Sequence, residues 1–575
     1  MLRKFFQKIN NLFSLSTLEK VYFIGFCVLL GTLSWYQLFR GEYYFQRAKN
    51  NYLKVLPLSS MRGEILDRNG ISIAYDRAEF NLGVIPYQVK TIKDSLFQEL
   101  SDYSSLSVGS LNKNYRRNLS SFFSPVDIIT NVDKTKALEL NEKFSDSLVI
   151  TTRPQRYYSN PYAFAHILGY VKQAKSFYEQ LKSYGYSPME RVGFGGIEQF
   201  YDTYLKGSDG GELVEVDSHG RIMGYLGQQR PQKGKDIYLT VDSLVQQAAY
   251  ESLGDRPGAV ILMNADNGEL ISLCSRPAFN PNSFIEGKNT SSFLNNSKSP
   301  LLNRALQAKY PMGSTFKPIV AVAALEEDKS KSSTTFDCNG ELRLGIAKFR
   351  CSHVHGRQNL FEAIAHSCNV YFYNLGLKIG PDALSRWARK FGLDSLTDVD
   401  LPFEARGFVP DVRWKQKKLK SNWFAGDTVN FSIGQGFMTA TPLATMRAMN
   451  VFASKGYLVK PQLIKKIDSV ESGAIDKTYL GISERTLEKV SQGLRETILR
   501  EDGTARILNR LNLKFSGKTG TAQNSGRPHG WFIGFFSYQE KTYTICVLLE
   551  HGGSSYEAVK IAYYFVKKIT ENKIL

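Results

Sequence analysis

Cysteine, histidine and tryptophan are scarce in this chain, which has six, seven and five of them among 575 residues. So few thiols over this length exclude a small fold built from disulfides. Hydrophobic residues make up 42% and charged residues 22%, which excludes a disordered or collagen-like chain and a multi-span membrane protein. The length predicts about three or four domains, or two large ones.

Acidic residues are the minority charge, since 54 Asp and Glu residues accompany 73 Lys and Arg residues and the formal net charge is +19. Such an excess is compatible with nucleic acid, with an anionic membrane surface, or with a basic surface that only aids solubility. No nucleic-acid-binding motif accompanies the charge, so we expect no nucleic-acid partner.

Long apolar runs are also rare, and the one that stands out is Val21–Phe39, with 19 residues and no charge. It is long enough to cross a hydrocarbon core of about 30 Å. A cleaved signal peptide would have a shorter apolar stretch, of about 7–15 residues. The run ends in Trp35, Tyr36 and Phe39, aromatic residues that suit a membrane interface. The sequence therefore predicts one membrane anchor, with a buried core helix as the alternative.

Lys and Arg residues flank this run equally, four before it and four within a similar distance after it. Because the side with more Lys and Arg normally stays in the cytoplasm, the count leaves the orientation open. We expect a tail over residues 1–20, an anchor over 21–39, and the rest of the chain on one side of the membrane.

A polar stretch with proline and glycine, Gln229–Lys235, divides the remaining chain. Residues 40–230 predict a domain of short mixed elements, and residues 231–575 predict a compact domain of strands and helices. The elements expected in the second domain are 236–241, 243–253, 258–264, 269–275, 316–327, 530–537 and 542–550. An antiparallel sheet with helices packed on it accommodates them, so we expect an α+β fold.

Ser314 and Lys317 are the first catalytic candidates, in the sequence YPMGSTFKP. On a helix, side chains three residues apart lie on one face, where a lysine amine can take a serine proton if burial keeps it partly neutral. Pro318 fits the first turn of a helix, so we expect a helix to begin near Ser314 with the hydroxyl at its positive end. Ser-x-x-Lys alone is more often a chance pair that faces solvent.

Two later motifs make the serine–lysine pair more significant. Ser367-Cys368-Asn369 begins 53 residues after Ser314, and Lys518-Thr519-Gly520-Thr521 begins 151 residues after Ser367. On an edge strand, the Lys-Thr-Gly motif would present a cation and hydroxyls to a carboxylate, with glycine allowing close approach. Each motif is weak alone, but the three in this order are a specific combination.

Four residues with metal-binding side chains lie within residues 338–368: Cys338, Cys351, His355 and Cys368. Three sulfurs and an imidazole form a good tetrahedral zinc set. A Cys338–Cys351 disulfide, or free thiols, are the alternatives, and His353 is a competing imidazole.

The remaining cysteines and His529 have simpler interpretations than metal binding. Cys27, Cys274 and Cys546 lie in apolar stretches, where cysteine behaves as a small hydrophobic residue. His529 either lines the cleft or ends a strand.

The three motifs in this order resemble those of the class B penicillin-binding proteins, most closely of the elongation-specific type. The likeness covers nearly everything after the anchor. The segments that carry it besides the catalytic motifs are Met61–Asn69 (MRGEILDRN), Ala165–Val171 (AHILGYV), Gly195–Leu205 (GGIEQFYDTYL), Gly434–Gly436 (GQG) and Trp531–Phe535 (WFIGF). The resemblance implies one transmembrane helix, an elongated pedestal domain and a penicillin-binding, β-lactamase-like transpeptidase domain.

The resemblance also implies acyl transfer at a D-alanyl-D-alanine stem of peptidoglycan. Ser314 would attack the penultimate D-Ala carbonyl with Lys317 as general base, and β-lactams would acylate the same serine. Ser367 would pass the proton to the leaving amine, and Asn369 would hold the peptide backbone.

The last motif would recognise the end of the stem peptide. Lys518 would polarise Ser367, while Thr519 and Thr521, on either side of Gly520, would bind the terminal carboxylate. The N–H groups of Ser314 and Thr521 would form the oxyanion hole.

Further expectations concern the cofactor and the surroundings. Some elongation-type members carry a structural zinc in a pattern similar to this one, with carboxylates allowed at its first positions, so Asp337 competes with Cys338. The resemblance places the tail in the cytoplasm, the catalytic domain outside, and a glycan polymerase of the SEDS family alongside as a partner.

Three alternatives remain open. They are a septal transpeptidase, a mainly non-catalytic activator of the polymerase, and a serine β-lactamase, for which we identify no matching hydrolytic carboxylate. Carboxypeptidase activity beside transpeptidation is also open.

Overall fold

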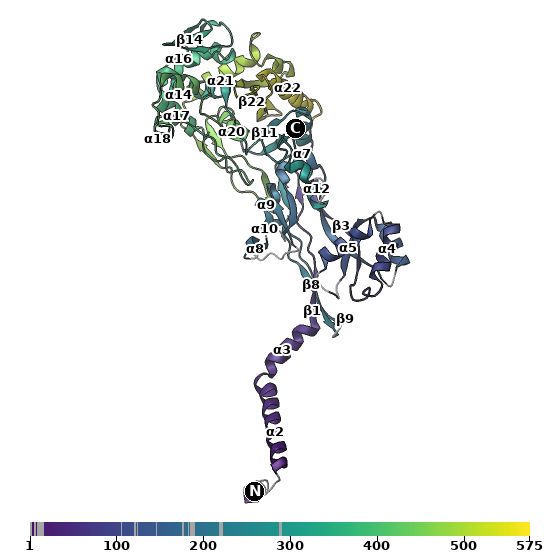
Figure 1. The fold of residues 1–575 in the computed structure, drawn as a ribbon. Helices are drawn as coiled ribbons and strands as arrows, with labels where there is room; N and C mark the ends of the chain where they lie inside the picture. The colour runs from purple at the N-terminus through teal and green to yellow at the C-terminus, as the bar shows by residue number, and fades with distance from the viewer. Residues whose placement is uncertain are drawn as a thin grey trace. The chain divides into compact units, whose positions relative to one another are not determined.

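The computed structural model describes the chain except for residues 1–2, 5–6, 8–16, 105, 120–121, 123–124, 145–146, 175–177, 182, 184–189, 218–221 and 287–289. Most of the predicted tail, 1–20, therefore lies outside the described residues. The chain forms two compact units (Figure 1): one holds residues 1–61, 78–155 and 208–232, and the other holds 62–77, 156–207 and 233–575. The predicted domain limits at residues 40, 230 and 231 stay a prediction.

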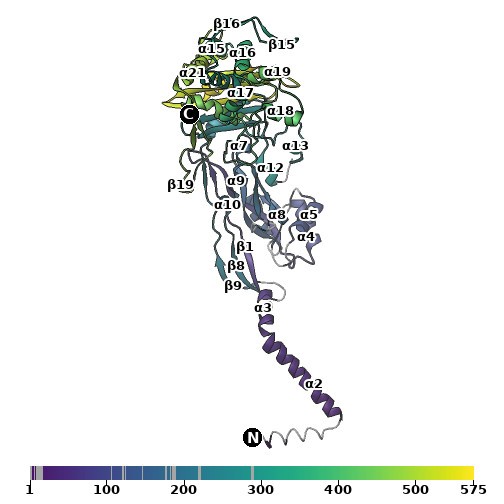
Figure 2. The same ribbon diagram turned by 90° about the vertical axis from the view of Figure 1, so that its left-hand side faces the viewer.

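The first unit begins with the apolar helix. Helix α2 (Thr17–Ser34) continues as a π-helical turn, η1 (Trp35–Phe39), and helix α3 (Gly41–Tyr52) follows after Arg40 (Figure 2). Glu19–Phe39 is long and apolar enough to span a membrane, and its side chains are unburied. The predicted run Val21–Phe39 lies within this segment.

A small sheet and part of a larger one complete the first unit. The small sheet is antiparallel, in the order β1 (Leu53–Leu58), β8 (Gly210–Val216) and β9 (Ile222–Gln229). In the other part, β4 (Val126–Val132) pairs with the end of β3 (Ser72–Val84), and the start of β5 (Val149–Tyr158) lies beside them. Helices α4 (Lys93–Tyr103), α5 (Val108–Asn118) and α6 (Lys134–Lys143) pack around a core that includes Leu82, Phe97 and Ile128.

The second unit includes short segments that the sequence assigns to the pedestal. Their elements are β2 (Ile65–Leu66), α7 (Pro161–Leu168), β6 (Tyr170–Gln173), α8 (Tyr178–Leu181), β7 (Arg191–Phe194), α9 (Gly196–Phe200) and α10 (Asp202–Leu205). A buried ionic network joins them. Arg62 Nε donates to Glu198 Oε2 at 2.6 Å, Arg62 Nη2 donates to Asp202 Oδ1 at 2.6 Å, and Arg156 Nε donates to Glu198 Oε1 at 2.7 Å. Burial alone would raise the pKa of Glu198, but the two guanidinium groups outweigh it and hold the pKa below its usual value.

The catalytic sheet has five antiparallel strands in the order β12-β11-β23-β22-β21. Their bounds are β11 (Gly258–Asn264), β12 (Leu270–Arg276), β21 (Lys514–Ala522), β22 (His529–Tyr538) and β23 (Lys541–Leu549). Helices α11 (Ser243–Leu253) and α22 (Ser555–Glu571) pack on one face of the sheet over Val260, Phe532 and Val547. The predicted hairpin, the late strand pair and the position of the Lys-Thr-Gly motif on an edge strand are confirmed, as is the α+β class.

The other face of the sheet contacts the main helical core. Its helices are α14 (Lys317–Glu326), α15 (Leu360–Ala365), α16 (Asn369–Ile379), α17 (Pro381–Lys390), α18 (Val412–Leu419), α19 (Ala425–Ser432), α20 (Pro442–Ala453) and α21 (Glu484–Leu499). Short elements connect them: η4 (Gly313–Phe316), β13 (Phe336–Cys338), β14 (Glu341–Leu344), β15 (Ala347–Arg350), β16 (Gly356–Gln358), β17 (Tyr457–Val459), β20 (Lys477–Tyr479) and η5 (Arg506–Leu511). The remaining elements are β10 (Ile237–Leu239), α12 (Pro281–Glu286), α13 (Thr290–Leu294), β18 (Ile464–Ile467) and β19 (Val470–Glu471).

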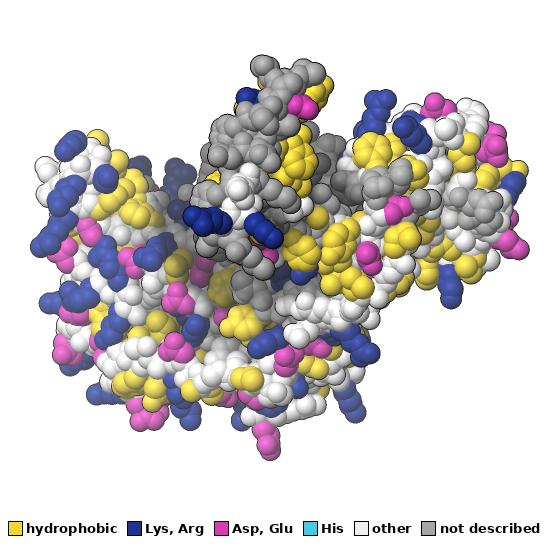
Figure 3. Space-filling view, turned by 90° about the horizontal axis from the view of Figure 1, so that it is seen from below, with side chains coloured by type: hydrophobic (Ala, Val, Ile, Leu, Met, Phe, Trp, Pro, Cys, Tyr) yellow, Lys and Arg dark blue, Asp and Glu magenta, His cyan; other side chains and the backbone are white. Residues whose placement is uncertain are grey.

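The positive charge is spread rather than gathered on the face shown in Figure 3. Lys and Arg side chains there alternate with Asp and Glu side chains and with hydrophobic ones. On that face, no single patch gathers the Lys and Arg side chains.

Candidate active site

Ser314 lies in a tight turn that leads into a buried helix. The turn is the 3₁₀ helix η4, which continues directly into α14 at Lys317, so a helix begins near Ser314 as predicted, although its first turn is 3₁₀ rather than α. The N–H of Lys317 donates to the backbone oxygen of Ser314. In a 3₁₀ turn, side chains three residues apart eclipse, so Ser314 and Lys317 still project from the same side. Pro318 occupies the first turn of α14, as expected.

Close backbone contacts hold this turn from two directions. Gly313 has φ +56° and its N–H donates to the backbone oxygen of Gly434 at 2.9 Å. A Cβ at Gly434 would lie 2.4 Å from the oxygen of Gly313, so a side chain there would displace the turn. On the other side, a Cβ at Gly313 would lie 3.1 Å from the oxygen of Thr521 on β21. The Gly-Gln-Gly loop and the edge strand therefore fix where Ser314 sits.

Lys317 is fully buried, and its amine reaches the second motif. Nζ donates to the backbone oxygen of Ser367 at 2.7 Å and to Asn369 Oδ1 at 2.7 Å, and it lies 3.3 Å from Ser367 Oγ. Burial lowers the pKa of Lys317 to about 8, and negative charge on the neighbouring cysteine sulfurs, above all Cys351, opposes this shift. About a tenth of such an amine is neutral at pH 7.

Ser367 has an uncommon backbone conformation, with φ +58°. A non-glycine residue in this left-handed region costs about 1 kcal/mol and persists where the surroundings impose it. The surroundings here are the N–H of Ser367, which donates to Ile364, and that of Cys368, which donates to Ala363. The turn directs Ser367 toward Lys317 and starts α16 at Asn369.

The Lys-Thr-Gly motif divides its side chains between the two faces of β21. Lys518 is fully buried, and burial together with Lys317 holds its pKa well below the usual value. A Cβ at Gly520 would lie 2.9 Å from Thr315 Cγ2, so position 520 faces the nucleophile turn. Successive residues of a strand point to opposite faces, and Thr519 and Thr521 accordingly have other partners.

Those partners are residues that the sequence reasoning missed. Thr519 Oγ1 donates to Thr504 Oγ1 at 2.8 Å, and Thr521 Oγ1 accepts from the N–H of Ser555 at 3.2 Å. Thr519 is 3% exposed, whereas Thr521 is exposed. Thr504 lies in the loop after α21 and belongs to no motif, so a sequence search for motifs cannot find it.

The predicted metal ligands lie together. The ligand atoms of Cys338, Cys351, His355 and Cys368 are all within 4.8 Å of one another, and His355 Nδ1 is 3.5 Å from Cys338 Sγ and 3.4 Å from Cys351 Sγ. Ligand atoms around a tetrahedral zinc are about 3.5–3.8 Å apart, so the donor set fits this ion. All six cysteines of the chain are free thiols in the structure.

The competing ligands lie outside this cluster. Asp337 is exposed and precedes the buried Cys338 on β13, where neighbours point to opposite faces. His353 is also exposed, with its ring 5.9 Å from that of His355.

The cysteine cluster contacts the catalytic turn directly. The N–H of Asn369 donates to Cys351 Sγ at 3.1 Å, and Asn369 Nδ2 donates to the backbone oxygen of Arg350. His366, which the sequence reasoning also missed, stacks on His355 and lies 2.9 Å from the carboxylate of Asp502. Cys338 ends β13, while Cys351, His355 and Cys368 lie next to the ends of β15, β16 and α16. Figure 1 shows the neighbouring strand β14 beside α16.

The structure agrees with the interpretation of Cys274 and Cys546 as core residues and of His529 as a strand end. Cys274 and Cys546 are buried in β12 and β23, and burial raises the pKa of Cys274 to about 12. His529 is the first residue of β22, and its Nε2 is 2.8 Å from Asn524 Nδ2.

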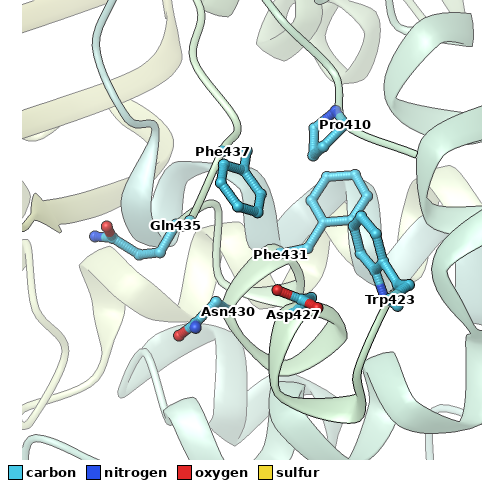
Figure 4. A pocket seen from close by; sticks show the side chains of 8 residues that line it. Pro410, Trp423, Asp427, Asn430, Phe431, Gln435 and Phe437 are labelled. Carbon is cyan, nitrogen blue, oxygen red and sulfur yellow. The ribbon is translucent and has the colours of Figure 1, made fainter. Parts of the chain in front are cut away.

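A cavity of about 120 Å³ lies behind the Gly-Gln-Gly loop (Figure 4). Trp423, Phe431 and Phe437 form its walls, and Asp427 points into it between Trp423 and Phe431. Lys415 Nζ neutralises Asp427 at 2.5 Å. Phe431 also stacks on Phe316 of the nucleophile turn, so one wall of the cavity packs against this turn.

The fold and the three motifs define a class of enzyme with a serine nucleophile and a buried lysine. Comparisons with known proteins identify the family. Family models match for the penicillin binding protein transpeptidase domain over residues 258–571 and for the penicillin-binding protein dimerisation domain over residues 57–239. The chain belongs to the penicillin-binding proteins.

Several of its relatives are the elongation-specific transpeptidase MrdA. It is 32% identical to peptidoglycan D,D-transpeptidase MrdA of Acinetobacter baumannii, over 93% of this chain and 84% of the relative. It is 30% identical to MrdA of Escherichia coli K12, over 93% and 91%. The protein is therefore a serine peptidoglycan D,D-transpeptidase of the elongation type.

Solved structures give the same result. The complex of penicillin-binding protein PBP2 with MreC from Helicobacter pylori matches with a TM-score of 0.81 at 29% identity, over 91% of this chain and 100% of the other. A peptidoglycan synthase complex described as coordinating polymerization and crosslinking matches with a TM-score of 0.73 at 29% identity, over 95% and 97%.

Proposed function

We propose that Ser314 is the acylated residue of this transpeptidase and Lys317 its general base. The observation that carries this proposal is the environment of Lys317, a fully buried amine whose pKa falls to about 8 and which bonds to both polar residues of the second motif. An amine with a pKa near the working pH is well suited to accept and return a proton.

Acylation would use Ser314, Lys317 and Ser367 in turn. The lone pair of neutral Lys317 takes the proton of Ser314 as Oγ bonds to the penultimate D-Ala carbonyl carbon. The C–N bond then breaks, and the proton passes from Lys317 by way of Ser367 Oγ, 3.3 Å away, to the departing D-Ala amine. An amine of a second stem peptide attacks the resulting ester, forms the cross-link and returns the proton to Ser314.

Charge and dipoles on β21 would stabilise this reaction. The buried Lys518 lies near Lys317 and would contribute positive potential when it is protonated. Thr521 is an exposed residue that would bind the substrate carboxylate. The N–H groups of Ser314 and Thr521 supply the oxyanion hole, where each donor contributes about 10²–10³ in rate.

The cysteine cluster would hold one structural Zn²⁺ through Cys338, Cys351, His355 and Cys368. The distances among the four ligand atoms support this assignment, and a closed four-ligand site supplies rigidity rather than chemistry. Since Cys351 accepts the N–H of Asn369, the rigid site would stabilise the turn that carries Ser367.

The setting is a membrane. Glu19–Phe39 would anchor the chain with its tail in the cytoplasm and its catalytic part in the periplasm, where the stem peptides are. A SEDS-family polymerase would supply the glycan, and the basic surface suits anionic lipid and pyrophosphate-linked precursors. One relative is solved with MreC, which makes a protein similar to MreC a candidate partner.

The test is mass spectrometry of the full-length protein in detergent after treatment with labelled penicillin. One adduct on Ser314, absent in Ser314→Ala, is expected; an adduct elsewhere, or none, contradicts the assignment. Native mass spectrometry of the same sample separates one added zinc from the two-hydrogen deficit of a disulfide. In cells, cross-linking that survives Ser314→Ala would instead favour a non-catalytic activator.

A further inference from the structure

Thr504 belongs to no catalytic motif, yet its side chain connects two of them. Thr519 Oγ1 is 2.8 Å from Thr504 Oγ1, and Thr504 Oγ1 is 3.4 Å from the backbone oxygen of Ala365. Thr519 lies in the Lys-Thr-Gly motif on β21, and Ala365 is two residues before Ser367. The two hydroxyls form a hydrogen-bonded link between both motifs, which we call the Thr504 bridge.

Helix α21 fixes the two elements that the Thr504 bridge connects. A Cβ at Gly493 on α21 would lie 2.6 Å from Ile364 Cδ1 on α15, so these helices are in close contact. Arg495 Nη1 donates to the backbone oxygen of Phe515 on β21 at 2.9 Å. The same helix therefore packs on α15 and on β21.

The loop after α21 leaves Thr504 little freedom. A Cβ at Gly503 would lie 2.5 Å from the backbone oxygen of Thr497, so the chain passes close to the helix end. The N–H of Thr504 also donates to Ala365 at 3.4 Å. Because Thr519 is 3% exposed and Ala365 is fully buried, water has little access to the bridge.

The hydrogens of the Thr504 bridge can change direction. A hydroxyl has one rotatable hydrogen to donate and two lone pairs to accept. In the structure Thr519 donates to Thr504, and Thr504 donates to Ala365. A carboxylate only accepts, so Thr519 can bind one only by turning its hydrogen away from Thr504.

Thr504 can then reverse its own role at small cost. The bond that it gives up is the long one, at 3.4 Å, and Ala365 keeps the N–H of Thr504 as a donor. The hydrogen of Thr504 becomes free to point at Thr519 across the same 2.8 Å.

We propose that Thr504 is a positioning residue that donates to Thr519 when Thr519 donates to the terminal carboxylate of a stem peptide or a β-lactam. A donor that itself accepts a hydrogen bond is polarised and binds its acceptor more strongly. The inference rests on the proposed function, because it requires the β21 motif to bind the carboxylate of the acylating substrate.

The test compares two probes of Ser314 in the full-length protein in detergent. Labelled penicillin carries a carboxylate, whereas phenylboronic acid adds to a serine hydroxyl and carries none. Thr504→Val keeps the shape of the side chain and removes the hydroxyl. We expect it to lower the second-order rate of penicillin acylation about tenfold or more, the effect of leaving a buried hydroxyl unpartnered. We expect the affinity for phenylboronic acid to stay within about twofold, and Thr504→Ser to restore acylation.

Two control variants separate this role from a general structural one. Thr497→Val makes the same change at a buried α21 hydroxyl that bonds within its own helix, and Asp502→Asn weakens the other contact of this loop with the Ser367 turn. Both control variants should leave the ratio of the penicillin acylation rate to the phenylboronic acid affinity unchanged.

Several outcomes would overturn the proposal. They are an equal loss with both probes, no loss with penicillin, a failure of Thr504→Ser to restore acylation, or a control variant with the same selective loss. If Thr504→Val does not fold, Thr504→Ala is compared with Thr504→Ser in its place. Wild-type protein without a penicillin adduct on Ser314 would instead refute the proposed function.

Discussion

Two regions where the molecule buries charge, the network around Glu198 and the active site, treat it in opposite ways. Around Glu198, two guanidinium groups contact carboxylates, and this pairing raises the pKa of Arg62 although burial lowers it. In the active site, Lys317 and Lys518 are buried near each other, and among the described residues neither has a carboxylate partner. Burial lowers both lysine pKa values.

The difference separates structural from catalytic charge. A paired buried charge is locked in one protonation state, and removing one partner leaves the other uncompensated. An unpaired buried amine instead titrates within the working pH range, which suits it to proton transfer. In the active site, therefore, burial of Lys317 does not stabilise the fold. It lowers the pKa of the amine and so makes it reactive.

The largest effect that tests this contrast is expected for Lys317→Met. Without the amine, penicillin acylation should fall about 10²–10⁴-fold, the usual contribution of a general base. The protein should remain folded, because relief of the desolvated amine offsets the loss of its hydrogen bonds. Stopped-flow kinetics measure the acylation rate, and circular-dichroism melting measures the stability. A large loss of stability with normal acylation would show that Lys317 is structural rather than catalytic.

Glu198→Gln should produce the opposite pattern. It leaves Arg62 and Arg156 without their shared carboxylate, which should cost about 3–5 kcal/mol of unfolding free energy. Acylation per folded molecule should be unchanged. Denaturant unfolding followed by active-site titration of the folded fraction checks both, and a specific acylation defect would show that the network also serves catalysis.

The pH dependence of the acylation rate should also distinguish the active site from the Glu198 network. Neutral Lys317 is the reactive form and its pKa is about 8, so the second-order acylation rate should rise about tenfold per pH unit below 8 and level off above it. Since the folded pKa lies below the unfolded one, this lysine destabilises the fold most below pH 8, and that penalty fades as the pH rises to about 10.5. Glu198→Gln should leave the rate profile unmoved; a flat profile in wild type would contradict the base assignment.

The smallest effect is expected for an exposed ion pair. Lys568 on α22 contacts Glu251 on α11, with both side chains nearly half exposed. Glu251→Gln should change the unfolding free energy by at most about 1 kcal/mol and leave acylation unchanged. A loss as large as that of Glu198→Gln would mean that burial is not what distinguishes the networks.

Sequence reasoning predicts local features of this protein well. The periodicity of 243–253 and the Asn-Gly turn between 258–264 and 269–275 specify α11 and the β11–β12 hairpin, because the signal lies in neighbouring residues. The four cysteine and histidine ligands fall into one cluster for the same reason, since they lie within one short segment.

What the sequence does not predict depends on long-range contacts. Thr504 and Asp502 meet the Ser367 turn from about 140 residues away along the chain, and no local pattern marks them. The 3₁₀ turn at Ser314 is imposed by Gly434 rather than by helix propensity. Arg62 and Glu198 likewise pair across 136 residues, which is why segments of the predicted pedestal belong to the second unit.

That interleaving decides which recombinant fragments can be made. The chain passes between the two units at residues 61, 77, 155, 207 and 232. A fragment that starts at residue 231 would omit β2, whose Ile65 pairs with Ile237 of β10, and would leave that strand an open apolar edge. A soluble enzyme suited to inhibitor screening therefore has to lose only the membrane anchor and retain the chain that follows it, including β1, which pairs with β8.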